Sequence, residues 1–255
     1  MPLSSANARL AAARRLTRRQ GRSDAGRFLA EGAQAVREAL AADAVLDLFA
    51  TAEARERHPD LAVNAAQISA KDAASLSETV TPQGLVAVCQ LFQPTLAEVL
   101  AARPRLLALL VEPNDPGNLG TVIRTADAAG ADAVVVHGGV DAYNGKAVRA
   151  SAGSVFHLPI LDSSAMDALV AAHAAGLRTL ATTGAGACDL DELIDAGVLA
   201  APTMWLFGSE AHGLPREVID AARDSVRVPL RGRAESLNLA AAAAVCLYAS
   251  ARAQR

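Results

Sequence analysis

Short apolar runs alternate with amphipathic segments along most of the chain, and the alternation is most regular from Leu106 onward. The apolar runs predict buried strands, and the segments between them, with apolar residues at helical spacing, predict helices. The expected strands are Leu106–Val111, Ala133–His137, Phe156–Leu161, Leu177–Ala181, Met204–Phe207 and Val226–Val228. The expected helices are Asn118–Ala129, Lys146–Ala152, Ala165–Ala175, Leu190–Ala196, Pro215–Ala222 and Leu239–Arg252. This alternation favours a parallel sheet with helices on both faces, in which ligands bind beyond the carboxyl ends of the strands.

The first hundred residues carry a less regular version of the same alternation. Ser5–Arg19 predicts a helix with Ser4 or Ser5 as its N-cap. Arg27–Leu40 predicts a short extended entry followed by a second helix. Buried strands are expected at Val45–Ala50 and Leu85–Leu91, and a helix is expected between them at Ser69–Leu76.

The organisation that follows is two α/β domains joined by a linker. Gln93–Pro104 has no clear periodicity and ends at a proline, as linkers do. We therefore expect a small α/β domain over residues 1–100 and a larger parallel-sheet domain over residues 105–255. A length of 255 residues suits two modest domains, and 52% apolar residues exclude a wholly disordered chain.

Several classes of protein are disfavoured by composition. The longest apolar stretches, such as Leu239–Ala249, are too short for a membrane span, and the first residues lack the apolar core of a signal peptide. Three cysteines far apart indicate neither a disulfide framework nor a zinc site, and the five histidines show no ligand spacing. We expect a soluble cytoplasmic protein without a metal.

The net charge of −3 hides a strong asymmetry. Residues 1–27 contain seven arginines and one acidic residue, so the rest of the chain is distinctly acidic. A basic N-terminal segment on an otherwise acidic chain is a candidate nucleic-acid-binding region, because the planar guanidinium group of arginine suits phosphate contacts. A solvated helix face explains the arginines equally well at this stage.

Polar segments follow three of the expected strands and are candidates for chemistry. The first, Glu112–Ala126, places a Pro-Gly turn before Asn118, which can cap the next helix, and sets Arg124 in an otherwise apolar helix. That arginine either forms an ion pair within the protein or binds an anionic ligand. The second segment, Leu206–Pro215, holds Glu210 and His212 between two glycines.

The third polar segment, Val228–Asn238, lies directly before the most apolar helix of the chain. Ser236 or Asn238 can serve as the N-cap of that helix, yet the density of polar residues exceeds what a cap needs. No glycine fingerprint of a dinucleotide fold or a P-loop occurs anywhere, which argues against a dehydrogenase on a Rossmann sheet.

Together, these segments resemble the signature motifs of the SpoU (TrmH-like) family of SPOUT RNA 2′-O-ribose methyltransferases. The N-x-G-x-x-x-R-T-A motif is present as Asn118–Ala126, F-G-x-E as Phe207–Glu210 and V-P-x-x-G-x-x-x-S-L-N as Val228–Asn238. Asn144–Ser154 is similar to the substrate-side loop and helix of the family. Residues 1–100 resemble, more loosely, the ribosomal-protein-like RNA-binding module that often precedes the catalytic domain.

The resemblance implies a fold, a reaction and a site. The fold would be a parallel-sheet α/β catalytic domain with a C-terminal trefoil knot, an exception to the rule that chains do not thread themselves. The reaction would be transfer of a methyl group from S-adenosylmethionine to a ribose 2′-hydroxyl in RNA. The implied catalytic residues are Asn118, Arg124, Glu210, Ser236 and Asn238. The implied cofactor-binding residues are Thr182, Gly208, Val228 and Leu237.

The resemblance also implies partners. The RNA-binding residues would include Arg14, Arg15, Arg18, Lys146 and Arg149, and a homodimer through the knot domain would complete the site. Ribosomal RNA is favoured over transfer RNA because tRNA-specific relatives often carry only short N-terminal extensions. The alternatives that stay open are a tRNA 2′-O-methyltransferase and a non-catalytic RNA-binding or ribosome-assembly protein with the same fold.

Overall fold

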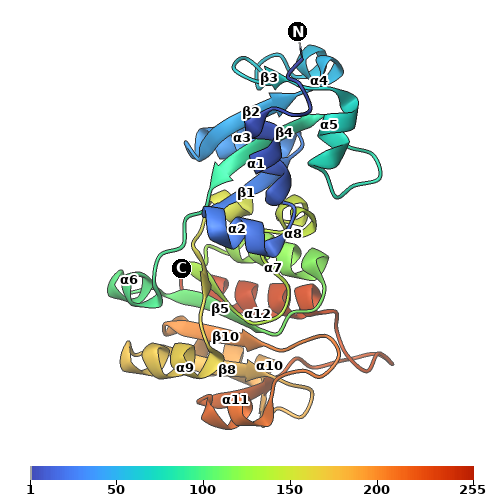
Figure 1. The fold of residues 1–255 in the computed structure, drawn as a ribbon. Coiled ribbons are helices and arrows are strands. Elements are labelled where there is room, and N and C mark those ends of the chain that lie inside the picture. Colours follow the sequence, from blue (N-terminus) through green and yellow to red (C-terminus); the bar gives the residue numbers. More distant parts are fainter. Residues whose placement is uncertain (1) are drawn as a thin grey trace. The chain divides into compact units, whose positions relative to one another are not determined.

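The computed structural model describes residues 2–255, which form two compact units (Figure 1). One unit contains the chain up to Phe92 and the segment Asp141–His157, and the other contains Gln93–Val140 and Leu158–Arg255. The chain therefore leaves the second unit after Val140, contributes Asp141–His157 to the first unit, and returns. The expected division into residues 1–100 and 105–255 did not include this excursion.

The first unit is a four-stranded sheet with helices packed on it. Its strands are β1 (Arg27–Glu31), β2 (Val45–Ala50), β3 (Ala66–Gln67) and β4 (Leu85–Gln90), and its helices are α1 (Ala8–Arg15), α2 (Arg19–Ala25), α3 (Ala33–Ala41), α4 (Ala52–Arg57), α5 (Ala70–Ser75) and α8 (Gly145–Ala150). The strand order is β1-β4-β2-β3, with β4 antiparallel to both of its neighbours. Leu10 and Leu16 pack with Phe49, Val86 and Val88 in one apolar core between α1 and the sheet.

The predicted helix at Ser5–Arg19 is helical only over Ala8–Arg15, and a second helix, α2, begins where the prediction ends, at Arg19. The chain breaks after α1, and Gly21 lets α2 approach closely, because a Cβ there would overlap the carbonyl group of Arg15. The N-cap of α1 is Asn7, whose side chain accepts from the backbone N–H of Arg9, so the expected cap at Ser4 or Ser5 is wrong.

The segment Asp141–His157 belongs to the first unit through aromatic contacts and a buried ion pair. The ring of Phe28 in β1 lies 4.8 Å from that of Tyr143 and 5.5 Å from that of Phe156, between ring centres. Arg22 in α2 donates to the carboxylate of Asp141 at 2.7 Å and to the carbonyl group of Leu16 at 2.8 Å. An arginine with only 7% of its side chain exposed is tolerable because these partners compensate its lost hydration.

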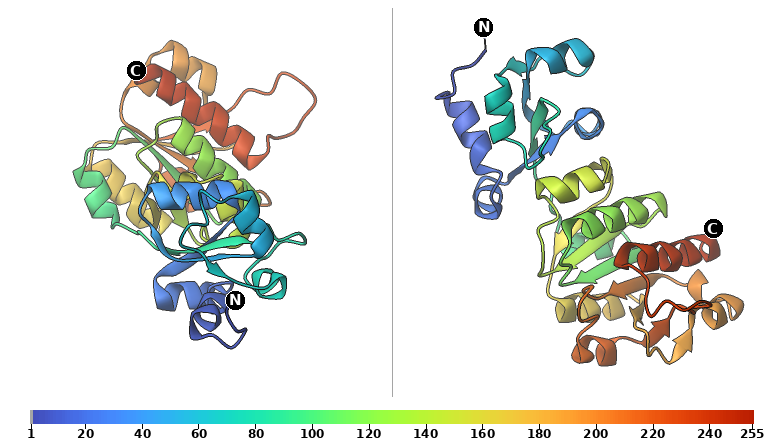
Figure 2. Two further views of the ribbon diagram at one scale, coloured as in Figure 1. Left: turned by 90° about the horizontal axis from the view of Figure 1, so that it is seen from above. Right: turned by 90° about the vertical axis from the view of Figure 1, so that its right-hand side faces the viewer.

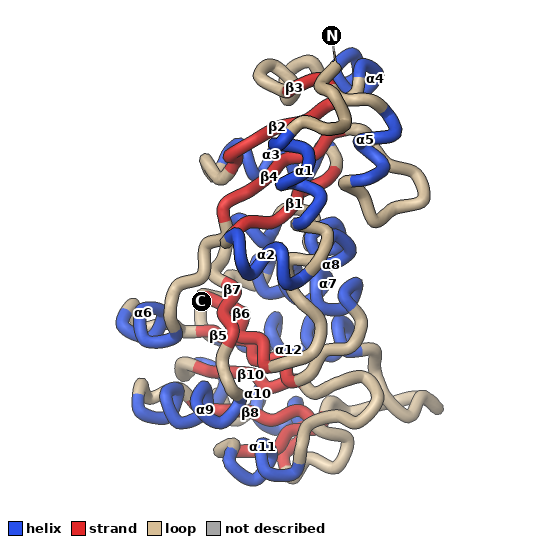
Figure 3. The backbone as a smooth tube through the Cα atoms, in the orientation of Figure 1, coloured by secondary structure: helices blue, strands red, loops and turns tan. Residues whose placement is uncertain are grey.

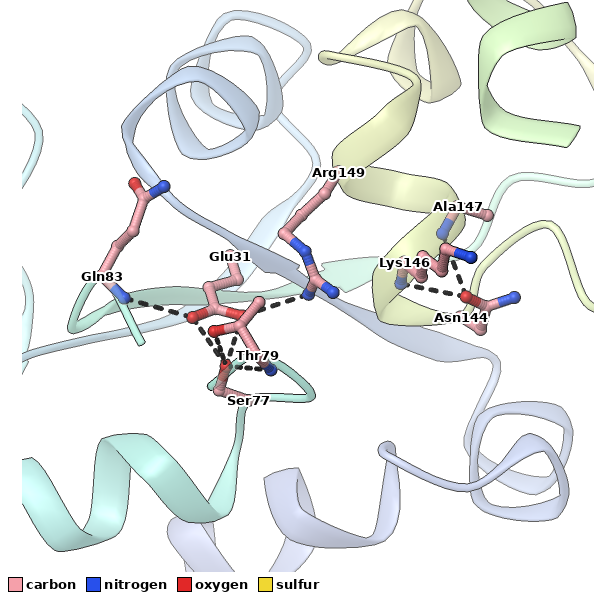
Figure 4. A network of polar contacts seen from close by, with 8 residues as sticks. All are labelled: Glu31, Ser77, Thr79, Gln83, Asn144, Lys146, Ala147 and Arg149. Carbon is pink, nitrogen blue, oxygen red and sulfur yellow. Dashed lines mark hydrogen bonds and ion pairs between the residues drawn. The ribbon is translucent and has the colours of Figure 1, made fainter. Parts of the chain in front are cut away.

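A second polar cluster joins α8 to β1 (Figure 4). The buried carboxylate of Glu31 accepts from Ser77 Oγ at 2.7 and 2.8 Å, from the backbone N–H of Gln83 at 3.3 Å and from Arg149 at 3.3 Å. Asn144 caps the start of α8 by accepting from two backbone N–H groups. Because Ser77 and Gln83 lie in the loop after α5 and Arg149 lies in α8, the cluster ties this loop, β1 and α8 together.

The second unit is a seven-stranded parallel sheet, as the alternation predicts (Figure 3). Its strands are β5 (Leu106–Val111), β6 (Ala133–His137), β7 (Ile160–Asp162), β8 (Arg178–Thr182), β9 (Cys188–Asp189), β10 (Thr203–Phe207) and β11 (Asp224–Arg227), in the order β7-β6-β5-β10-β8-β11-β9. Its helices are α6 (Leu96–Ala101), α7 (Pro116–Ala128), α9 (Ala165–Ala174), α10 (Leu190–Asp195), α11 (Arg216–Ala221) and α12 (Leu239–Ala253).

Helices cover the sheet so that its strand ends stay open to ligands. Apolar residues of α6, α9 and α11 share one core with the strands. Helix α12 lies beside α7 and contacts β5 and β10 (Figure 2). The buried indole N–H of Trp205 in β10 donates to Ser250 Oγ of α12 at 2.8 Å.

Three further details differ from the sequence-based expectations. The segment expected to be a linker contains α6, which begins at a capping box between Thr95 and Glu98. The strand expected at Phe156–Leu161 begins only at Ile160 because Ser154–Phe156 forms a 3₁₀ turn. No helix within residues 2–255 combines the length and the apolar character that crossing a membrane requires.

Candidate functional site

A cavity of about 330 Å³ opens at the carboxyl ends of β8, β10 and β11 in the second unit. Its wall consists of the segments that follow these strands and the start of α12. The volume lies within the range of roughly 300–1,000 Å³ typical of small-molecule sites. Its place beyond the ends of parallel strands is where open α/β sheets bind their ligands.

All four residues predicted to bind a cofactor line this cavity. Thr182 is the last residue of β8, Gly208 follows β10, Val228 follows β11 and Leu237 precedes α12. Thr182 is held by its hydroxyl group, which donates to the carbonyl group of Leu206 at 2.8 Å. The remaining wall combines glycines and aliphatic side chains with polar and charged ones, namely Thr183, Ser209, Glu210, His212, Glu235 and Ser236.

Gly208 begins a tight loop in the cavity wall. Ser209 and Gly213 exchange two backbone hydrogen bonds, at 3.1 and 2.9 Å. A Cβ on Gly208 would overlap the backbone of Gly213, so only glycine allows this closure. Glu210 and His212 project from the loop, and both line the cavity.

A chain of hydrogen bonds joins three of the predicted catalytic residues. Asn118 Nδ2 donates to Glu210 Oε1 at 2.8 Å, and Asn238 Nδ2 donates to Asn118 Oδ1 at 3.0 Å. Asn238 is also the N-cap of α12, where its Oδ1 accepts from the backbone N–H of Ala240 at 2.9 Å. Residues far apart in sequence therefore meet at one place, and every amide in the chain has a fixed orientation.

The carboxylate of Glu210 is stabilised in its charged form. Partial burial by itself raises its pKa, but the hydrogen bonds from Asn118 and from the backbone N–H of Asn114 outweigh burial and lower the pKa below its ordinary value. Glu210 therefore carries a negative charge at neutral pH, at the edge of the cavity.

The loop before α7 contributes residues that the motif did not single out. Asp115, not Asn118, is the N-cap of α7, since its carboxylate accepts from the backbone N–H of Asn118 at 2.8 Å. Asn114 contributes its backbone N–H to Glu210. A signal for the cap was present in the sequence: Asp115 directly precedes Pro116, and proline favours the first position of a helix.

The other two predicted catalytic residues lie apart from this chain of hydrogen bonds. Ser236 lines the cavity from the exposed loop between β11 and α12, which extends away from the sheet (Figures 1 and 2). Arg124 is exposed on α7 and forms no side-chain hydrogen bond or ion pair with any residue from 2 to 255. Among residues 2–255, the carboxylate of Glu210 bonds Asn118 and the backbone of Asn114 and does not pair with Arg124.

The predicted RNA-binding residues of the first unit fall into two groups. Arg14 bonds Asp72 at 2.7 Å and Ser75 at 2.9 Å, and Arg149 bonds Glu31, so both have partners within the unit. Arg15, Arg18 and Lys146 are exposed. Contact of any of them with RNA stays a prediction.

The fold and the cavity define an α/β protein with a candidate small-molecule site beyond the strand ends of a parallel sheet. Comparison with known families refines this class. Residues 105–248, more than half of the chain, match the SpoU rRNA Methylase family, and residues 7–87 match the MRM3-like substrate binding domain. Among residues 2–255, no three His, Cys, Asp or Glu side chains gather as a metal site would require.

Similar proteins extend over nearly the whole chain. The 23S rRNA (guanosine(2553)-2′-O)-methyltransferase RlmP of Bacillus subtilis is 34% identical over 92% of this chain and 92% of its own length. The structure of the SpoU methyltransferase AviRb of Streptomyces viridochromogenes in complex with the cofactor AdoMet is 32% identical, with a TM-score of 0.81, and covers 96% of this chain and 97% of that chain. A structure concerned with 2-OH methylation of C/U34 on tRNA is 31% identical, with a TM-score of 0.51, and covers 58% of this chain and 94% of that chain.

The chain belongs to the SpoU rRNA methylase family. The resemblance inferred from the three motifs is thus confirmed.

Proposed function

We propose that this protein is an RNA methyltransferase that uses S-adenosylmethionine to methylate a ribose 2′-hydroxyl of ribosomal RNA. The observation that carries the proposal is the meeting of Asn118, Glu210 and Asn238, from three separate motifs, beside a cavity lined by Thr182 and Gly208. Family membership and the full-length likeness to ribosomal RNA methyltransferases support the same reaction.

The cavity fits S-adenosylmethionine in size and chemistry. Thr182, Gly208, Val228 and Leu237 would hold it through backbone groups and aliphatic surface, and Gly208 leaves the wall free of a side chain. When bound, S-adenosylmethionine supplies a methyl group carried on a positively charged sulfur. The carboxylate of Glu210 gives this cavity wall a negative charge, which favours a cationic ligand.

The residues around the cavity would position the ribose and manage the charge that develops on its oxygen. Asn118, which accepts a hydrogen bond from Asn238, donates to Glu210 and holds it in place, and Ser236 would orient the ribose. Arg124 would bind the neighbouring phosphate and stabilise the developing alkoxide. A role as general base is disfavoured, since a guanidinium group rarely gives up a proton in a protein.

We also propose a homodimer and a knotted C-terminal segment. The face made by α7 and α12 exposes Tyr248 (49%) and Val245 (43%), and the loop before α12 exposes Leu237 (37%). A second copy covering these residues would bury them and would bring a ligand within reach of Arg124, whose side chain is exposed on the same pair of helices. The knot would form where the loop before α12 and the helix itself tuck beside α7.

Ribosomal RNA is the proposed substrate because the RlmP relative, matched over nearly its full length, is named as a 23S rRNA methyltransferase. The RlmP relative matches 92% of this chain, whereas the tRNA-related structure covers only 58% of it. Action on ribosomal RNA would place the protein in the cytoplasm.

The test measures cofactor binding and methyl transfer separately. Calorimetry with S-adenosylmethionine should show binding by the wild type and by Arg124→Ala. Mapping of 2′-O-methyl groups on ribosomal RNA should show transfer by the wild type, with Arg124→Ala slower by about 100-fold because it loses charge stabilisation. Arg216→Ala, which alters an exposed arginine on α11, serves as the matched control and should retain full activity.

Two outcomes would contradict the proposal. Failure of both proteins to bind S-adenosylmethionine would favour a non-catalytic RNA-binding relative. Normal methylation by a folded Arg124→Ala protein would remove Arg124 from the site.

A further inference from the structure

The first unit contains a cavity of about 570 Å³ that the reaction does not use. It lies between α1, α2 and the sheet, where Arg27 of β1, Leu46 and Asp47 of β2 and Val88 of β4 form part of its wall. All of its lining residues belong to the first unit, so it is separate from the cavity at the strand ends of the second unit.

The inner wall of this cavity is apolar. Ala13, Leu16 and Val88 are each at most 5% exposed, and they line the cavity together with Ala12 on the open side of α1. Leu46 at the rim is 49% exposed, although it lies within a strand. Such a wall suits the flat face of a nucleobase, which is apolar while its edges are polar.

Arginines surround the apolar wall. Arg9 is held in place by an ion pair with Asp47, and its guanidinium group lies over the ring of Phe49 at 5.6 Å from the ring centre. Half of the Arg9 side chain remains exposed, so a fixed guanidinium plane lines the cavity, and such planes stack on unpaired bases.

Two further arginines at the cavity are available for phosphate. Arg15 and Arg27 are exposed, and their side chains form no hydrogen bond or ion pair with the residues that the structure describes. The acidic residues at the cavity already have partners: Asp47 holds Arg9, and Asp24 accepts from Gln20 at 2.6 Å. Two unpaired positive charges beside an apolar pocket complement one base and its flanking phosphates.

We propose that this cavity binds a single unpaired nucleotide of the RNA substrate, with the base between Arg9 and the apolar wall and its phosphates on Arg15 and Arg27. This inference rests on the proposed action on RNA and assigns recognition to one face of the first unit. A base within a duplex cannot enter a pocket of this shape, so the cavity selects single-stranded loops or bulges.

The test measures binding of a fluorescein-labelled single-stranded RNA of mixed sequence to the full chain, by anisotropy at several salt concentrations. Ala12→Leu places a larger side chain in the cavity wall without changing charge, and we expect it to weaken binding about tenfold, as loss of one stacked base does, with no change in salt dependence. Ala11→Leu, on the same helix but outside the cavity wall, is the matched control and should bind as the wild type does.

The charge variant has a different expected signature. Arg15→Gln/Arg27→Gln should lower the slope of log affinity against log salt by about 1.4, the value for two phosphate contacts on a single strand. Arg57 is an exposed arginine on α4, and Arg57→Gln should lower this slope less. The same RNA annealed to its complement should bind the wild type more weakly and should be insensitive to Ala12→Leu.

Three results would overturn the inference: equal binding by Ala12→Leu and Ala11→Leu, equal binding of single strand and duplex, or no RNA binding by the wild type. Calorimetry with S-adenosylmethionine separates these failures from failure of the proposed reaction. The cofactor site lies in the other unit, so Ala12→Leu should bind S-adenosylmethionine as the wild type does.

Discussion

Asn118 makes both side-chain hydrogen bonds that connect Glu210 to Asn238, so Asn118→Ala tests the site directly. The substitution removes a 2.8 Å bond to a charged carboxylate and a 3.0 Å bond to a neutral amide. When shielded from water, a hydrogen bond to a charged group contributes about 1.5–3 kcal/mol to stability, and a hydrogen bond between neutral groups contributes about 0.5–1.5 kcal/mol. Glu210 and Asn238 are exposed, so hydrogen bonds to water replace much of the stabilisation that the two bonds of Asn118 provide. We therefore expect the free energy of unfolding to fall by about 1 kcal/mol.

The same substitution should change how Glu210 titrates. Its folded-state pKa is below the ordinary 4.5, so its carboxylate contributes stability above that pH, and the contribution is lost as the pH falls through the lower folded value. Without the bond from Asn118, the pKa should rise toward the ordinary value. The difference in stability between wild type and variant should therefore shrink as the pH is lowered into this range.

The assay is a carbon-detected NMR titration of the glutamate carboxyl groups, with Glu210 assigned from Glu210→Gln. The matched control is Asn114→Ala, because Asn114 contributes only its backbone N–H to Glu210, and alanine keeps that donor. Methyl transfer should fall about 100-fold in Asn118→Ala from lost positioning and stay near wild type in Asn114→Ala. An unchanged Glu210 titration in a folded Asn118→Ala protein would refute the reasoning.

Two other predictions concern buried groups. Ser250→Ala should lower the free energy of unfolding, measured in urea, by about 1–3 kcal/mol because it leaves the indole N–H of Trp205 buried without an acceptor. The double variant Trp205→Phe/Ser250→Ala should lose less stability than the sum of the two single variants. Simple additivity would argue against the hydrogen bond. In the native protein, Cys188 should react with a thiol reagent at pH 8 while Cys89 and Cys246 stay protected, because burial raises the pKa of each buried thiol to about 12; rapid labelling of all three before unfolding would contradict this burial.

Local patterns in the sequence were sufficient for most of the second unit. The strands Leu106–Val111 and Ala133–His137 match β5 and β6 to the residue, because a continuous apolar run buried on both faces is visible without knowing its neighbours. The same holds for the start of α12, where Asn238 precedes an apolar helix and caps it.

The motifs also located residues that line the cavity at the strand ends of the second unit. Thr182, Gly208, Val228 and Leu237 end or follow strands or precede the last helix, and parallel strands bring such segments to one edge of the sheet. Sequence therefore determined which residues line the cavity, although it did not determine their partners.

Only the tertiary structure decided which side chains form hydrogen bonds and ion pairs with one another. Glu210 bonds Asn118 and the backbone of Asn114, which lie more than ninety positions away in sequence, and not Arg124. Arg149 bonds Glu31 because Asp141–His157 packs in the first unit, and nothing in the composition of that segment distinguishes the two units.

The difference between what the sequence determined and what the tertiary structure decided has a physical cause. Helix periodicity, strand burial and capping depend on residues within a few positions of one another, so the sequence by itself determined most elements of the second unit, the presence of two domains and the motif residues. Ion pairs and hydrogen bonds between distant segments depend on which elements become neighbours, and many arrangements of the same elements satisfy the local pattern equally well. Only the assembled core, by excluding water from particular faces, decides which charged and polar side chains meet.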